Sequence, residues 1–294
     1  IDIPLDVQKA EVKKNLLKPF IKNKINLNRN KLKKDIDKAL VLLKKSSKPL
    51  LVVGNGVKQS KTIGDLKKLI KKTKIPTIFS RFGHDLISHD NKHIMGQAGI
   101  KGSRFCKKIM NQSDLVLSLG CRLAPQFVGH NFKAFSNAKV ISVDVEKDEL
   151  IKKGQKIDLK LNYDLKEFFP KFIGSLKNLN FNKYKNWTDY CEKLKKNNPI
   201  INEKHKKNPI DLYYFMERLG ELSKKNDILI TDAGSNYYVG GQVWKFKKGQ
   251  KEICSVANAA MGLSVPLSIG AAVASPKSMI LAVTGDGSLE LNIQ

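Results

Sequence analysis

Short, uninterrupted apolar runs alternate with amphipathic segments along most of this chain. Runs of strand length occupy residues 50–53, 75–79, 115–119 and 139–143, and most of them end at a glycine or an aspartate. A strand that is apolar along its whole length is buried on both faces, and helices between such strands provide the cover. The alternation therefore predicts an α/β chain whose parallel strands are joined by right-handed crossovers.

The segments between these runs have helical periodicity. Residues 30–45 carry apolar side chains at three- and four-residue spacing, and residues 62–72 and 103–111 are also predicted helices. Together with the strands they predict a first domain over residues 1–175. We expect it to be a parallel sheet of the six-stranded type, preceded by a lysine-rich entry segment.

A second α/β unit follows a change in composition. Residues 176–208 are rich in lysine and asparagine, which predicts a surface linker with one helix near 187–196. The last domain, residues 209–294, is predicted to contain a helix at 210–222, strands at 227–230 and 279–284, and an alanine- and glycine-rich helix within 256–274. The sequence thus predicts two doubly wound parallel-sheet domains.

The net charge of +27, from 54 basic and 27 acidic residues, raises the question of a nucleic-acid partner. Only five of the basic residues are arginines, the side chain best suited to bidentate contacts with phosphates and guanine edges. The lysines fall on predicted solvated helix faces, so we expect no nucleic-acid partner. No apolar run approaches the roughly 18 residues of a membrane span, so we expect no membrane association either.

Cysteine and histidine usage argues against a metal cluster. The chain has four cysteines, Cys106, Cys121, Cys191 and Cys254. They form no Cys-x-x-Cys pair, which disfavours disulfides and zinc and favours a reducing, cytoplasmic location. His84, His89 and His93 have irregular spacing in a predicted loop, so we expect solvated histidines rather than metal ligands.

The motif that points to chemistry follows the last predicted strand, where Gly285, Asp286, Gly287 and Ser288 precede a helix expected to begin at Leu289. Glycines let the backbone approach a phosphate, and a helix start offers it free N–H groups. Asp286 is placed to hold a Mg²⁺ ion that bridges to that phosphate. Alone, the motif is equally consistent with a turn in which Asp286 caps the helix.

Three segments, residues 232–235, 259–272 and 285–294, resemble in order and spacing the cofactor domain of the thiamine diphosphate-dependent enzymes, in particular the acetolactate synthase large (catalytic) subunit. Residues 259–294 are the most specific part. The likeness extends to residues 1–8, similar to the strand that closes that family's pyrimidine-binding domain, and to the core of its Rossmann-like central domain at residues 48–56, 111–122 and 140–146.

The resemblance implies a role for several residues. Asp286 would bind Mg²⁺. The cofactor diphosphate would be met by Gly285, Asp286, Gly287 and Ser288 and by Gly234, Ser235 and Asn236. Met261 would be the catalytic residue, lying under the bridge between the two cofactor rings and forcing the bent conformation. The alternative for Met261 is a core methionine that fills a gap.

Some positions depart from the family pattern. Ser235 and Asn236 stand where acetolactate synthases carry Gln and His, and residues 256–258 replace a glycine-rich turn. In the central domain the resemblance implies FAD or another nucleotide at Gly54, Gly56, Gly120, Arg122 and Asp144. The acidic residues that follow the arginine in the family are replaced there by Leu123, Ala124 and Pro125.

The resemblance implies a thiamine diphosphate- and Mg²⁺-dependent transferase that decarboxylates a 2-oxo acid such as pyruvate and joins the product to a second carbonyl, in branched-chain amino acid biosynthesis. It also implies a homodimer or homotetramer and a regulatory subunit. We expect the catalytic glutamate of the pyrimidine domain before Ile1 and the second metal ligand after Gln294. The alternatives are a 2-oxo acid decarboxylase, a glyoxylate, sulfoacetaldehyde or polysaccharide-pathway relative, or a non-catalytic nucleotide-binding module.

Overall fold

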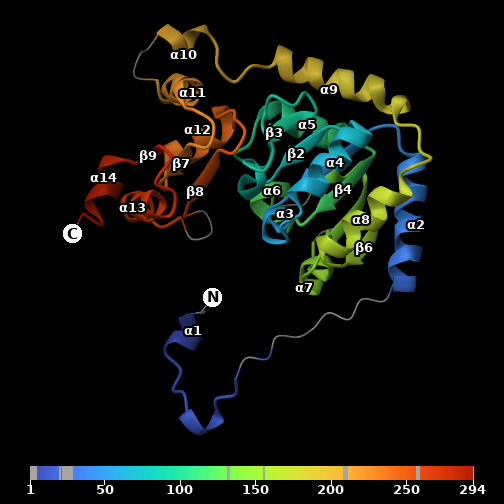
Figure 1. Cartoon of the computed structure of the whole chain (residues 1–294), viewed down its shortest axis with the longest axis horizontal. Helices are drawn as coiled ribbons and strands as arrows, with labels where there is room; N and C mark the ends of the chain where they lie inside the picture. The colour runs from blue at the N-terminus through green and yellow to red at the C-terminus, as the bar shows by residue number, and fades with distance from the viewer. Residues whose placement is uncertain are drawn as a thin grey trace.

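The computed structural model describes residues 5–19, 21, 29–130, 133–154, 156–207, 211–255 and 259–293. In this part of the chain two parallel sheets are flanked by helices, which confirms the predicted α/β class (Figure 1). The first sheet has six strands in the order β3-β2-β1-β4-β5-β6, and the second has three in the order β8-β7-β9.

The six strands of the first sheet are β1 (Pro49–Val53), β2 (Thr77–Phe79), β3 (Ile94–Gln97), β4 (Leu115–Leu119), β5 (Lys139–Asp144) and β6 (Leu159–Asn162). Every neighbouring pair runs parallel. All five residues of β1 and of β4 are buried, as expected for central strands covered on both faces. The order reverses between β1 and β4, which is where ligands bind in open sheets of this kind.

Helices cover both faces of the first sheet. One face packs against α2 (Arg29–Lys45), α4 (Ile63–Thr73) and α8 (Leu165–Ser175), and the other packs against α5 (Arg104–Gln112) and α9 (Lys185–Asn197). Alternate residues of β1 divide between the two cores, with Leu51 and Val53 on the first and Leu50 and Val52 on the second. Amphipathic helices on both faces leave the carboxyl ends of the strands as the edge where loops meet.

The helix α9 lies in the segment predicted as a surface linker, and it is packed into the first unit. Trp187 and Cys191 of α9 are buried, and the Trp187 indole N–H donates to the Pro49 carbonyl at 2.9 Å. The domain boundaries that the sequence suggests stay a prediction, and the one between residues 208 and 209 lies outside the described residues.

The second sheet consists of β7 (Ile228–Thr231), β8 (Lys251–Cys254) and β9 (Ile280–Val283). On one face lie α11 (Leu212–Leu222) and α12 (Ser235–Val243), and on the other lies α13 (Ser264–Ala274). We expected a tightly packed α13, but only Ser264 and Ala271 of this helix are buried. A last helix, α14 (Asp286–Glu290), follows β9.

Short helices complete the described part: α1 (Leu5–Gln8), α3 (Gly56–Gln59), α6 (Pro125–Val128), α7 (Lys147–Ile151) and α10 (Glu203–Lys207), with 3₁₀ turns η1 (Lys14–Leu16), η2 (Arg81–Gly83), η3 (Lys133–Phe135) and η4 (Asn182–Tyr184). None of the described helices combines the length and the apolar character that a membrane span requires.

Candidate cofactor site

The carboxyl ends of β7 and β9 bring two of the motif segments together. These strands pair in parallel register, with Thr231 opposite Val283. The residues that follow, Asp232 and Thr284, are therefore neighbours, and the Thr284 hydroxyl donates a hydrogen bond to the Asp232 carboxylate at 3.3 Å. The glycine-rich motif that begins at Gly285 thus starts next to the one that begins at Asp232.

The carboxylate of Asp232 also holds the third segment. It accepts hydrogen bonds from the backbone N–H groups of Gly262 and Ser264, each at 3.0 Å, and from that of Ala233 at 2.7 Å. The residue is only 2% exposed. One side chain therefore connects the ends of β7 and β9 to the loop before α13.

Burial alone would raise the pKa of Asp232, but hydrogen bonds from Ser264, Ala233 and Gly262 outweigh it and lower that pKa. The carboxylate is therefore ionised at neutral pH. Sequence analysis did not select Asp232 as a site residue, although its position directly after a buried strand was a usable signal.

The loop that Asp232 holds carries Met261. The carbonyl of Met261 accepts a hydrogen bond from the Asn292 amide at 3.2 Å. The next residue, Gly262, has φ +83°, and a Cβ there would lie 2.7 Å from the Ser288 carbonyl oxygen, so glycine is required. The Met261 side chain is 53% exposed, which contradicts the alternative of a core methionine.

The helix that follows β9 begins earlier than predicted. It starts at Asp286 rather than at Leu289, because Gly285 takes the extended conformation of a helix N-cap. The alternative that Asp286 caps the helix is therefore wrong. Among the described residues its exposed carboxylate accepts only a local hydrogen bond, from the Gly287 N–H at 2.8 Å. Ser288, two residues on, is buried.

The start of α12 lies at the end of β7. Gly234 has φ +120° and precedes Ser235, the first residue of the helix. The Asn236 side chain is buried, and its Oδ1 has no hydrogen-bond partner among the described residues. An ideal Cβ at Gly234, Gly285 or Gly287 would meet no atom within 4 Å, so the backbone is open to an incoming group at all three positions. This open backbone fits a phosphate-bearing ligand, whereas the unpaired Asn236 Oδ1 is an acceptor and needs a hydrogen-bond donor.

The residues predicted to bind FAD lie at the carboxyl ends of β1, β4 and β5. Gly54 and Gly56 pack on Gly120, since a Cβ at Gly56 would lie 2.7 Å from the Gly120 Cα. The N–H of Gly56 donates to the Gly120 carbonyl at 3.0 Å, and that of Gly54 donates to the Leu119 carbonyl at 3.1 Å. Contact between two loops therefore accounts for these glycines.

The two charged residues of the predicted FAD site also have partners. Arg122 is paired with Glu149 at 2.6 Å. Asp144 accepts a hydrogen bond from the Glu146 N–H at 2.9 Å, and burial raises the pKa of Asp144. The glycine N–H groups are engaged by the loop contact, and only the exposed remainder of the Arg122 guanidinium is open, so these residues fit a nucleotide poorly.

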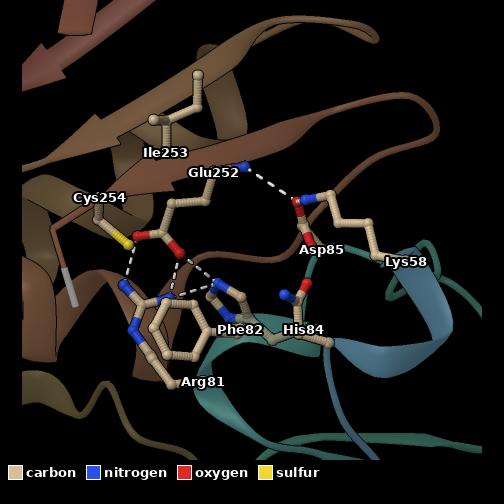
Figure 2. Close-up of a pocket in the computed structure, with 9 residues that line it drawn as sticks. Lys58, Arg81, Phe82, His84, Asp85, Glu252, Ile253 and Cys254 are labelled. Atoms are coloured by element: carbon tan, nitrogen blue, oxygen red, sulfur yellow. Dashed lines mark hydrogen bonds and ion pairs between the residues drawn. The ribbon is translucent and has the colours of Figure 1, made fainter. Parts of the chain in front are cut away.

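A buried charge cluster that sequence analysis missed joins the two sheets. Arg81 of η2, directly after β2, pairs through two nitrogens with the carboxylate of Glu252 on β8 (Figure 2). The His84 Nε2 lies 2.5 Å from the same carboxylate. The Arg81 and Glu252 side chains are 9% and 3% exposed, and a cavity of about 170 Å³ opens beside them.

The histidines of this region are not solvated, contrary to the prediction. His84 is 1% exposed and His93 is buried, and the His89 ring lies between Phe79 and Phe246. Burial lowers the pKa of His84, and it lowers the pKa of His89 to about 3. Burial would raise the pKa of Glu252, but Arg81 and His84 hold it below its usual value. No group of three or more metal-ligating side chains occurs in the described part of the chain.

Comparison with known proteins agrees with this architecture. The family model for the thiamine pyrophosphate enzyme central domain matches residues 36–172, and that for the C-terminal TPP-binding domain matches residues 232–294. Together the two matches cover about two thirds of the chain.

Similar proteins with a curated name are acetolactate synthase subunits. The chain is 29% identical over its whole length to the probable acetolactate synthase large subunit of Methanocaldococcus jannaschii, of which it covers 51%. It is 28% identical over its whole length to acetolactate synthase 1, chloroplastic, of Nicotiana tabacum (44% covered) and 25% identical to the isozyme 2 large subunit of Escherichia coli (52% covered). The chain thus spans about half the length of these relatives. Both domain matches fall on the two sheets described above, and the chain belongs to the thiamine pyrophosphate enzymes, of whose central and C-terminal TPP-binding domains it carries the sequence.

Proposed function

We propose that this chain is part of an enzyme that uses thiamine diphosphate and Mg²⁺ to decarboxylate a 2-oxo acid, such as pyruvate, and to join the product to a second carbonyl compound. The names of the relatives support the reaction, and the matched C-terminal domain supports the cofactor. The observation that carries the proposal is the convergence of three motif segments on the carboxylate of Asp232.

The site residues have distinct tasks in this proposal. Asp286 holds the metal ion, because its carboxylate is exposed at the start of α14. The backbone N–H of Ser288 binds the diphosphate, with Gly285 leaving room for it. The Gly287 N–H, which donates to the Asp286 carboxylate at 2.8 Å, joins it when that carboxylate turns to the metal ion.

The start of α12, which follows β7, meets the same diphosphate. Gly234 and Ser235 present open backbone, and Asn236 meets the diphosphate through its amide NH₂ group, because its unpaired Oδ1 can only accept. Met261 supports the bent conformation of the cofactor from its exposed position on the loop that Asp232 fixes. Bound thiamine diphosphate supplies the carbanion chemistry, while these residues bind it, orient it and exclude water.

The assembly and location of the protein are also proposals. The relatives are named large subunits, which favours a small-subunit partner, and we expect a homodimer or homotetramer of the catalytic chain. Four free cysteines in the described part of the chain, three of them buried, fit a reducing compartment such as the cytoplasm.

Two measurements on the full-length protein test the proposed function. Calorimetry with thiamine diphosphate should give binding in Mg²⁺ and none in excess EDTA. Incubation with pyruvate alone should then give acetolactate. Acetaldehyde as the sole product would instead identify a simple decarboxylase, and no binding of the cofactor in Mg²⁺ would refute the proposal.

A further inference from the structure

An arginine of the first unit is held inside the second. The Arg81 guanidinium donates to the carboxylate of Glu252 on β8 and, at 3.1 Å, to the backbone carbonyl of Tyr237 in the first turns of α12. It also stacks 4.1 Å from the centre of the Tyr237 ring. One side chain therefore contacts two elements of the second unit, β8 and α12; Figure 2 shows the contact with Glu252 of β8.

Both contacts lead to the candidate cofactor site. The Glu252 carboxylate accepts a hydrogen bond from the Thr231 hydroxyl at 2.8 Å, and Thr231 is the residue before Asp232. Tyr237 directly follows Asn236, whose buried amide oxygen has no partner in the described part of the chain. One residue, Tyr237, thus separates Arg81 from Asn236 on one path. Two residues, Glu252 and Thr231, separate it from Asp232 on the other.

The fit between α12 and the loop after β2 is close. A Cβ at Gly241 would collide with the Gln97 side chain and would lie 3.0 Å from Arg81 Nε. Because residue 241 is a glycine, α12 can pack directly on the side chains of Gln97 and Arg81. The position of the helix depends on where Arg81 is held.

A buried ion pair is weak support for stability, because apolar side chains of similar volume often stabilise a fold as well or better. Its advantage lies in geometry, since a planar guanidinium fixes the angle and distance of a carboxylate by two parallel hydrogen bonds. Such precision is useful where a neighbouring backbone must meet a ligand, because small misplacements of binding groups are costly.

We propose that Arg81 is a positioning residue for thiamine diphosphate. It sets the first turn of α12 through Tyr237 and the end of β7 through Glu252 and Thr231, although it lies in the other domain. The inference rests on the proposed function, because it assumes that residues 234–236 meet the diphosphate.

The test measures thiamine diphosphate affinity of the full-length protein by calorimetry at saturating Mg²⁺. Arg81→Lys keeps the charge and loses both the bidentate geometry and the stacking. We expect its Kd to rise about tenfold or more, the factor for losing one hydrogen bond to a charged group. Tyr237→Leu removes the stacking face without exposing a buried charge, and its Kd should rise about threefold or more.

Each variant has a matched control. Arg218→Met removes a surface arginine of α11, paired with Glu221, and Tyr190→Leu removes an exposed ring of α9 that stacks on Trp187. Both controls should keep the wild-type Kd. Hydrogen exchange of the α12 amides should increase in Arg81→Lys and stay unchanged in Arg218→Met, a readout that needs no cofactor.

The outcomes separate the two claims. If wild-type protein does not bind the cofactor, the proposed function fails, while faster α12 exchange in Arg81→Lys still establishes the link between the domains. If wild type binds and Arg81→Lys binds with the same Kd, the positioning role is overturned. If Arg81→Lys does not fold, Tyr237→Leu decides, and a wild-type Kd for that variant overturns the role as well.

Discussion

The Asp232 carboxylate accepts a hydrogen bond from the Thr284 hydroxyl across the ends of two neighbouring parallel strands. The same carboxylate accepts two backbone N–H groups from the loop that carries Met261. The candidate site is thus assembled around the Asp232 carboxylate of the protein itself. Asp286, the proposed metal ligand, follows Thr284 by two residues and is placed by the same contact.

Asp232→Asn is expected to destabilise the chain and to loosen the Met261 loop. The amide nitrogen would face a backbone N–H, so at least one buried donor loses its acceptor, at a cost of about 1–3 kcal/mol in the free energy of unfolding. Urea denaturation measures the change. Asp189→Asn is the control, because Asp189 is half exposed and pairs only with Lys185 on the surface of α9; a shift of less than about 0.5 kcal/mol is expected there. Equal stability of the two variants would contradict the role of Asp232.

Asp286→Ala should abolish Mg²⁺-dependent binding of thiamine diphosphate and leave the melting temperature nearly unchanged. The carboxylate is exposed, and its only described contact is the N–H of Gly287. Calorimetry and a thermal melt separate binding from folding. Glu290→Ala, at the exposed end of the same helix, is the matched control and should bind normally. Undiminished binding by Asp286→Ala would remove the metal role.

The stability of the chain should fall as the pH decreases from 7 toward 5. The folded-state pKa of His84 is lowered, and that of His89 is lowered to about 3, so both rings stay neutral when folded and take up protons when unfolded below about pH 6.5. The unfolded state then binds more protons than the folded state. Each additional proton lowers the free energy of unfolding by up to about 1.4 kcal/mol per unit decrease in pH. The carboxylate of Glu252, with its lowered pKa, adds to the loss only below about pH 4.3, where unfolded glutamate becomes protonated.

His89→Phe isolates one of these protons. The substitution keeps an aromatic ring in contact with Phe79 and Phe246. The number of protons taken up on unfolding, given by the slope of the unfolding free energy against pH, should fall by close to one. Parallel profiles for wild type and His89→Phe would show that His89 does not titrate on unfolding.

Two glycine substitutions compare a glycine required for the contact between two loops with a glycine that has free space around it. Gly56→Ala should destabilise the first unit by about 1–3 kcal/mol, because the new Cβ would lie 2.7 Å from the Gly120 Cα and the two loops would have to separate. Gly64→Ala, near the start of α4, meets no atom within 4 Å and should stabilise by about 0.5–1 kcal/mol. Denaturant midpoints of the two variants test the contrast, which would fail if both moved in the same direction.

We expect the purified full-length protein to carry no flavin. The N–H groups of Gly54 and Gly56 are engaged by the loop after β4, and Arg122 is paired with Glu149. The visible absorbance spectrum of the denatured protein's supernatant tests this directly. A stoichiometric flavin band would mean that these loops separate on binding.

The parts of the fold that the sequence predicts best are the fully buried strands. The ends of β1, β4 and β5 lie within one residue of the predicted runs. A strand covered on both faces is apolar at every position, so its run in the sequence is continuous and its ends are clear. β6 and β8 lie at sheet edges with partly exposed side chains, and their mixed sequences gave no such run. β3, the other edge strand of the first sheet, includes a glycine. β9 is also an edge strand, but its run was predicted because all four of its residues are apolar.

The candidate site was predictable where the motif is local and unpredictable where it depends on distant residues. Gly285 to Ser288 follow their strand directly, so their place at the sheet edge was clear. The burial of His84 depends on Glu252, 168 positions away, and a loop histidine gives no local sign of such a partner. The start of α14 was misjudged because the glycine–aspartate pair was taken for a turn, while Gly285 caps the helix.

Anchoring α9 on the first sheet has a further consequence for how the two units meet. With Trp187 fixed to the Pro49 carbonyl, only the connection from Asn197 to Leu212, which contains α10, remains between the units. A short tether keeps two surfaces at a high effective concentration, so contact between them costs far less entropy than association of separate molecules. The contacts between the units, among them the Arg81–Glu252 pair and the bond from the His89 N–H to the Phe246 carbonyl at 2.9 Å, can therefore form within one chain at a small entropic cost.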